Sequence, residues 1–136
     1  MAVEFGNNGV IDSLTHAPAP AIFLANLQRE YSSAQREKRF ISILSIAANT
    51  HELITDVQIT ALARTIVKHL RNEEFFSRIS ETGYWIAVRG GEDAAKNLAS
   101  RIIDDENKRW RASIIECTPF LTFDEWIGLV DRAHFN

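Results

Sequence analysis

A hairpin-like segment at residues 71–88 constrains the fold more than any other part of this sequence. It reads RNEEFFSRISETGYWIAV, so that Phe75, Phe76 and Ile79 precede a short polar stretch and an apolar run follows it. The polar stretch, Ser80-Glu81-Thr82-Gly83, is small and ends in glycine, which is typical of the turn between two antiparallel strands. We therefore predict a β-hairpin here.

The segments on either side of the hairpin predict further helices and strands from the spacing of their apolar residues. Pro20 suits a first helical turn, Thr55 or Asp56 suits an N-cap, and Thr122 with Glu125 matches a capping box. The expected elements are helices over 21–40, 56–70, 92–105 and 122–133, and strands over 41–48 and 112–117.

This order contains a βαββαβ unit and predicts an α+β fold with a ferredoxin-like core. An antiparallel sheet with flanking helices is the expected architecture. We assign residues 1–18 to an irregular N-terminal segment, because glycines, asparagines and prolines punctuate it, and residues 19–136 to one domain.

Composition excludes several classes of protein. The 136 residues are 46% hydrophobic and 24% charged, as in soluble globular domains, and the net charge of −3 gives no general attraction to nucleic acids or acidic membranes. No apolar run approaches the roughly 20 residues of a membrane-spanning helix, and the first residues lack the features of a secretion signal. The single cysteine, Cys117, lies in a strand-like segment and is expected to be inert. These features indicate a cytoplasmic protein without membrane insertion.

Several motifs, in this order, resemble those of GGDEF domains, the fold of diguanylate cyclases. Asp12-Ser13-Leu14-Thr15 resembles the opening Asp-x-Leu-Thr of that family. Arg78-Ile79 precedes the turn where the family has Arg-x-Gly-Gly-Asp/Glu-Glu-Phe. Residues 113–118 and 130–135 resemble its later Ser-Ile-Gly-Val-Ala strand and Ala-Asp-x-Ala-Leu-Tyr helix. The resemblance covers most of the chain and implies a bacterial domain of cyclic di-GMP signalling.

The same alignment implies that the catalytic acids are replaced. The positions that correspond to the family's active site are Ser45, Asp56, Ser80, Glu81, Thr82, Gly83 and Tyr84. In the family, a first-strand Asp and an acid of the turn hold the divalent cations that neutralise the triphosphate, and these positions are Ser45 and Thr82 here. Hydroxyl groups are weak, neutral ligands for such hard cations. We therefore expect a degenerate domain that has no catalytic residue, metal or cofactor and is not an enzyme. Glu81 as a metal ligand from the neighbouring position is the minor alternative.

A second family site has closer counterparts. Upstream of the hairpin, GGDEF domains often carry an Arg-x-x-Asp motif that binds the cyclic di-GMP product, and Arg71-Asn72-Glu73-Glu74 occupies this register. The family often adds an arginine from the next helix, and Arg101 matches it. Arginine can hydrogen-bond the O6/N7 edge of guanine, and a carboxylate can accept from its N–H groups. The competing interpretation is an ordinary surface ion pair between Arg71 and Glu74 beside a solvated Arg101.

Three functions follow from this resemblance. The first is an inactive GGDEF-like module that binds cyclic di-GMP through Arg71, Glu74 and Arg101 and acts on a protein partner or a neighbouring domain. The second is a structural interaction domain that binds no nucleotide. Either form could act as a homodimer. An active cyclase ranks third. The four histidines form no spaced ligand cluster, which argues against a metal site.

Overall fold

The computed structural model describes residues 10–49, 53–103 and 109–135. Its elements are α1 (Pro20–Glu37), β1 (Ile41–Ala48), α2 (Asp56–His69), β2 (Phe75–Ser80), β3 (Gly83–Arg89), α3 (Glu92–Ile102), β4 (Trp110–Glu116) and α4 (Phe123–Phe135). The predicted order of helices and strands is therefore confirmed, including the hairpin formed by β2 and β3.

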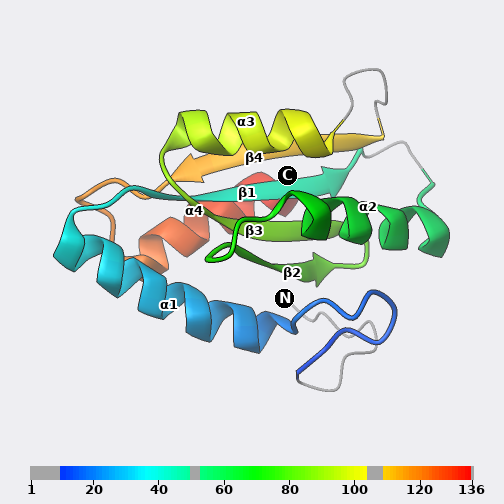
Figure 1. The fold of residues 1–136 in the computed structure, drawn as a ribbon, viewed down its shortest axis with the longest axis horizontal. Coiled ribbons are helices and arrows are strands. Elements are labelled where there is room, and N and C mark those ends of the chain that lie inside the picture. The colour runs from blue at the N-terminus through cyan, green and yellow to red at the C-terminus, as the bar shows by residue number, and fades with distance from the viewer. Residues whose placement is uncertain (1–9, 50–52, 104–108, 136) are drawn as a thin grey trace.

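The four strands form one antiparallel sheet in the order β2-β3-β1-β4 (Figure 1). In the middle of the sheet, Leu44 of β1 lies opposite Ile86 of β3 on one side and Ile114 of β4 on the other. The predicted α+β fold with a βαββαβ unit is confirmed. β2 and β4 are the two edge strands.

Helices cover both faces of the sheet and enclose two hydrophobic cores. α2 and α3 pack on the face that carries Leu44 and Ile86, and α1 and α4 pack on the face that carries Ile43 and Trp85. Successive side chains of a strand point to opposite faces. The continuous apolar run of β1 is therefore buried on both sides, as its sequence predicts.

Local signals fix the helix ends. The Thr55 side chain accepts from the backbone N–H of Gln58, whose side chain accepts from the backbone N–H of Thr55. Thr122 and Glu125 form the same reciprocal pair before α4. Both pairs satisfy N–H groups that a helix start leaves unpaired.

Small differences from the predicted boundaries occur at the helix and strand ends. α1 ends at residue 37 rather than near 40, because Lys38 adopts a left-handed conformation with φ of 55°. α2 ends one residue early, and β4 begins two residues before its predicted start. The predicted end of the third helix, 104–105, lies outside the described residues.

The described part of the N-terminal segment, residues 10–18, packs on the domain without a helix or long strand of its own. Ile11 and Pro18 form an isolated bridge, and the Asp12 carboxylate accepts from the backbone N–H and hydroxyl of Thr15. Asp12 and Thr15 thus close a turn before α1. Ala17 and Ala19 are buried, so this segment contributes to the core.

Within residues 10–49, 53–103 and 109–135, the structure contains no helix that combines the length and apolar character needed to cross a membrane.

Candidate functional site

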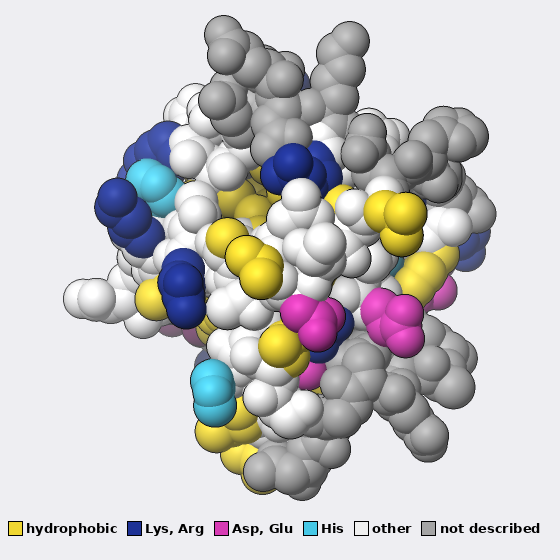
Figure 2. Space-filling model, turned by 90° about the vertical axis from the view of Figure 1, so that its right-hand side faces the viewer, with side chains coloured by type: hydrophobic (Ala, Val, Ile, Leu, Met, Phe, Trp, Pro, Cys, Tyr) yellow, Lys and Arg dark blue, Asp and Glu magenta, His cyan; other side chains and the backbone are white. Residues whose placement is uncertain are grey.

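The hairpin turn lies at the end of the sheet to which β1 also points (Figure 1). Glu81 and Thr82 make the turn, and Ser80 pairs with Gly83. The register shifts between Arg78 and Ser80, so Arg78 faces α2 while Ser80 faces α4. Figure 2 looks onto this end and shows acidic and basic side chains side by side among hydrophobic ones.

His134 of α4 joins two of the predicted active-site positions. Its Nδ1 lies 2.6 Å from Ser45 Oγ, and its Nε2 lies 3.0 Å from Ser80 Oγ. The ring is only 2% exposed. A neutral imidazole has one N–H and one acceptor nitrogen, so one serine donates to the ring and the other accepts from it. Ser45 therefore binds a side chain of its own protein.

The surroundings keep His134 neutral. Burial lowers the pKa of His134 to about 4, and the nearby Arg111 guanidinium contributes to the same shift. Gly83 packs directly against the ring, since a Cβ at residue 83 would overlap it and would lie 2.8 Å from the Ile46 carbonyl oxygen. This glycine is required for the close approach of strand and helix.

Asp12 and Arg78, 66 residues apart in sequence, form a buried ion pair in the same region. Arg78 Nη1 lies 3.2 Å from Asp12 Oδ1, and Arg78 Nη2 donates to the Glu81 carbonyl oxygen at 2.7 Å. The side chains are 6% and 1% exposed. This pair connects the N-terminal segment to the turn. We call these five residues (Asp12, Ser45, Arg78, Ser80 and His134) the turn network.

A shallow hollow of about 370 Å³ remains beside the turn network, on the side of α2. Its lining residues are Leu14, Ile54, Asp56, Ile59, Arg78, Glu81 and Thr82. The structure thus brings Asp56, Glu81 and Thr82 together. Tyr84 does not line this hollow: its hydroxyl donates to the Ile59 carbonyl oxygen at 2.9 Å, and burial raises its pKa. The described residues contain no group of three or more histidine, cysteine or acidic side chains that could hold a metal ion.

The second predicted site lies at the opposite end of the hairpin, where Arg71, Glu74 and Arg101 line one hollow of about 130 Å³. Its other lining residues are Arg89, Ala94, Asn97 and Leu98. Glu74 is held in place, because its two carboxylate oxygens accept from the backbone N–H groups of Arg71 at 3.0 Å and of Arg89 at 3.2 Å. We call this group (Arg71, Glu74, Arg89 and Arg101) the arginine hollow.

Arg78, Arg89, Asn97 and His134 were not among the predicted site residues. Arg89 reaches the arginine hollow from the end of β3, and Asn97 lies one helical turn before Arg101 on the same flank of α3. His134 had a clear signal: with Trp126 and Val130 it occupies every fourth position of α4, and all three side chains are buried. A histidine in the apolar stripe of a helix indicates a buried polar contact.

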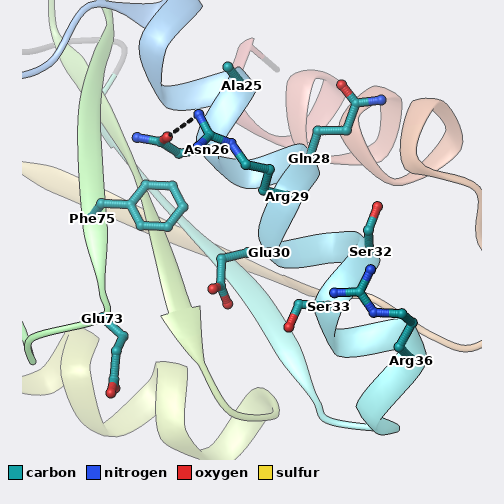
Figure 3. Close-up of a pocket in the computed structure, with 10 residues that line it drawn as sticks. All are labelled: Ala25, Asn26, Gln28, Arg29, Glu30, Ser32, Ser33, Arg36, Glu73 and Phe75. Carbon is teal, nitrogen blue, oxygen red and sulfur yellow. Dashed lines mark hydrogen bonds between the residues drawn. The ribbon is translucent and has the colours of Figure 1, made fainter.

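A hollow of about 870 Å³ lies between α1 and β2, and Glu73 of the predicted Arg71–Glu74 motif is one of its lining residues (Figure 3). Glu30, Arg29 and Arg36 line it together with Phe75, and Arg29 Nη2 donates to Asn26 Oδ1 at 3.1 Å. Acids and bases alternate here, so the surface has no charge preference for one ligand class. Cys117 is buried elsewhere, and its burial raises the pKa of the thiol to about 11, as expected for an inert cysteine.

Comparisons with known proteins agree with this architecture. No protein-family model and no curated protein sequence matches the chain. Among solved structures, the chain resembles diguanylate cyclase SiaD from Pseudomonas aeruginosa, solved with its activator SiaC, with a TM-score of 0.80 and 15% identity. The match covers 92% of this chain and 56% of the SiaD chain, so this chain spans little more than half of that protein.

Two further structures are GGDEF domains with a bound cyclic dinucleotide. The GGDEF domain of DgcB from Caulobacter crescentus, in complex with c-di-GMP, matches with a TM-score of 0.78 and 13% identity over 96% of this chain and 90% of that one. A microbial GGDEF domain with bis-(3′,5′)-cyclic di-GMP matches with a TM-score of 0.80 and 17% identity over 93% and 88%. The predicted resemblance is therefore confirmed at the level of the fold: this chain has a GGDEF-like fold.

Proposed function

We propose that this chain is a non-catalytic GGDEF-like signalling module that binds cyclic di-GMP in the arginine hollow. The observation that carries the first part is the contact of His134 with Ser45 and Ser80. The second part rests on the convergence of Arg71, Glu74 and Arg101.

Joining two GTP molecules requires divalent cations at the triphosphates, and such cations need carboxylate oxygens. At the first-strand position, Ser45 instead makes a 2.6 Å hydrogen bond to a neutral, buried imidazole. At the turn, Thr82 is neutral, and Glu81 would place an anion beside the triphosphate. These features support a module that has no catalytic residue, metal or cofactor.

The arginine hollow offers the groups that recognise guanine. The guanidinium groups of Arg71 and Arg101 can donate to the O6/N7 edge of a base and to phosphate oxygens. The third guanidinium group, that of Arg89, is paired with Glu30 at 3.4 Å and with Glu73 at 3.7 Å. The Glu74 carboxylate uses two of its lone-pair sites for backbone N–H groups and retains others for the N–H groups of guanine. At about 130 Å³ the hollow is smaller than most ligand pockets. Cyclic di-GMP is larger than this hollow, so the ligand would lie over it with only part of one base inside.

The structural neighbours supply an independent reason to choose this ligand. Two of them were solved with cyclic di-GMP, and SiaD was solved with an activator protein. We propose the same ligand for this chain, together with a protein partner or neighbouring domain that responds to it, in the cytoplasm.

Calorimetric titration of the purified chain with cyclic di-GMP tests the receptor function. We expect binding that Arg71→Ala and Arg101→Ala each weaken by about tenfold or more, the loss typical of a charged hydrogen-bonding partner. Arg64→Ala is the matched control, because Arg64 is an exposed arginine of α2 outside the arginine hollow. Absence of binding at high micromolar ligand, or binding that Arg71→Ala leaves unchanged, would exclude the receptor and leave the structural interaction domain.

A separate assay tests the absence of catalysis. The protein is incubated with GTP and Mg²⁺ or Mn²⁺, and we expect no cyclic di-GMP. Product formation that Glu81→Ala abolishes would contradict this proposal and identify Glu81 as a metal ligand.

A further inference from the structure

The two edge strands of the sheet differ in how they are covered. In β2, four of six residues are buried, and Ser77 Oγ donates to the Pro18 carbonyl oxygen at 2.6 Å, so the N-terminal segment packs beside this edge. In β4, none of the seven residues is buried. Within the described residues, β1 is the only strand that pairs with β4. An uncovered edge strand offers its backbone to another strand.

The register shows which groups β4 offers. The Cys117 N–H donates to the Ile41 carbonyl oxygen and the Asn49 N–H donates to the Arg109 carbonyl oxygen, both at 2.9 Å. Hydrogen-bonded pairs alternate along an antiparallel ladder, so the odd-numbered residues between these positions face β1. The residues whose backbone N–H and C=O groups point away from β1 are Trp110, Ala112, Ile114 and Glu116.

A hollow of about 310 Å³ lies on the α3 side of this edge. Its lining residues are Lys96, Ala99, Ser100, Ile103, Trp110, Ala112 and Ile114. Three of these residues, Trp110, Ala112 and Ile114, are among the β4 residues whose backbone groups point away from β1. Ala112 is exposed, while Trp110 and Ile114 on either side of it are partly buried. This edge of the described sheet therefore offers backbone groups that point away from β1 and a space for apolar side chains. Proteins that bind an added strand at a sheet edge use both features.

We propose that this added strand is β4 of a second copy of the chain, paired antiparallel about Ser113, so that two sheets become one. In this register Ala112 lies opposite Ile114 of the second copy, and the reverse pair forms across the twofold axis. The outward-facing residues of each strand meet those of the other, as the backbone pattern requires. The larger Ile114 side chain of each copy enters the space beside the small Ala112 of the other.

The distribution of charge is compatible with this occupant. Arg111 Nη1 donates to the Ala133 carbonyl oxygen of α4 at 3.0 Å, and Glu116 Oε1 accepts from the backbone N–H of Glu92 of α3 at 3.0 Å, so the two charges of β4 lie on opposite faces of the sheet. In this register Glu116 lies opposite Trp110 and Arg111 lies opposite Ile115 of the second copy, so no two like charges face each other across the twofold axis. Ala99 and Ser100 are small, so the two α3 helices can approach across the axis. The arginine hollow lies on the other flank of α3 and stays open in such a dimer.

Sedimentation equilibrium of the full chain over a range of concentrations tests the proposal. We expect a monomer–dimer equilibrium whose dissociation constant rises about tenfold or more with Ala112→Lys, because lysine on an edge strand opposes pairing. Ala61→Lys is the matched control, since it adds the same charge at an exposed alanine of α2. Ala112→Pro removes only an outward-facing N–H, so it should disrupt the dimer and leave the ladder with β1 intact.

Amide hydrogen exchange of the unmodified protein gives a second readout. Protection at Ala112 and Ile114 should rise with protein concentration, while Ser113 should be protected at every concentration because it faces β1. A chain that stays monomeric at every accessible concentration would overturn the proposal. A dimer that Ala112→Lys leaves intact would also overturn the proposal, because it would be formed by another surface. A dimer in which the exchange rates of Ala112 and Ile114 stay constant with protein concentration would overturn it for the same reason.

Discussion

The turn network and the arginine hollow lie at opposite ends of the same hairpin and use polar side chains in opposite ways. In the turn network, Asp12, Ser45, Ser80, Arg78 and His134 are buried or nearly so and are bonded to one another or to backbone. In the arginine hollow, Arg71 and Arg101 are exposed and line a hollow of about 130 Å³.

Because of this difference, we expect substitutions in the turn network and in the arginine hollow to have different effects. A buried polar group that forms a hydrogen bond stabilises the fold, because its removal leaves the partner group buried without a hydrogen bond to protein or to water. An exposed charged group contributes little to stability and remains free to bind a ligand. Changes in the turn network should therefore alter folding, and changes in the arginine hollow should alter binding.

The largest effect is expected from Asp12→Ala. Removal of this carboxylate leaves the Arg78 guanidinium buried without its anion and should lower the free energy of unfolding by about 3–5 kcal/mol. Urea denaturation measures the change. Asp12→Asn, which keeps an acceptor oxygen for Thr15 and Arg78, is the control and should cost less. An Asp12→Ala variant as stable as the parent would show that the contacts of the turn network do not stabilise the fold.

A somewhat smaller effect is expected from acid, through His134. In the unfolded chain this histidine titrates near its ordinary pKa of 6.5, whereas in the folded protein burial lowers the pKa to about 4. Between these values the unfolded state binds more protons, so the free energy of unfolding falls as the pH drops from about 6.5 to 4, by up to about 3 kcal/mol. The measurement compares denaturation curves of the parent and of His134→Leu across this range. Parallel pH profiles for the two proteins would contradict a buried, neutral His134.

The smallest effect on folding is expected from Arg71→Ala. Because Arg71 is exposed, the substitution should change the free energy of unfolding by less than about 0.5 kcal/mol, although we expect it to weaken cyclic di-GMP binding. Thermal denaturation without ligand provides the measurement. A large loss of stability would show that Arg71 has a structural role, and the contrast between the two ends of the hairpin would then fail.

The sequence predicted the fold well because its signals were local. The continuous apolar run of β1, the turn at 81–82 and the capping pairs at Thr55 and Thr122 are each signals within a few residues. The arginine hollow was also predictable in part, since Arg71 and Glu74 are three residues apart in a motif.

The turn network was not predicted because its contacts join distant segments. Asp12 and its partner Arg78 are 66 residues apart in sequence. Ser45 and His134 are separated by 89 residues, so the pattern within either segment does not indicate that they are in contact. Such pairs depend on how α4 and the N-terminal segment pack against the sheet, and residue spacing does not report this packing.

The close packing of Gly83 against His134 also limits the order in which this sequence can change. Any side chain at residue 83 would overlap the His134 ring. An aspartate at residue 45 would likewise meet this ring, because Ser45 Oγ already lies 2.6 Å from Nδ1. A variant with acidic side chains at both positions would therefore have to replace His134 first. If the acids came before that change, the chain could not pack its hairpin against α4.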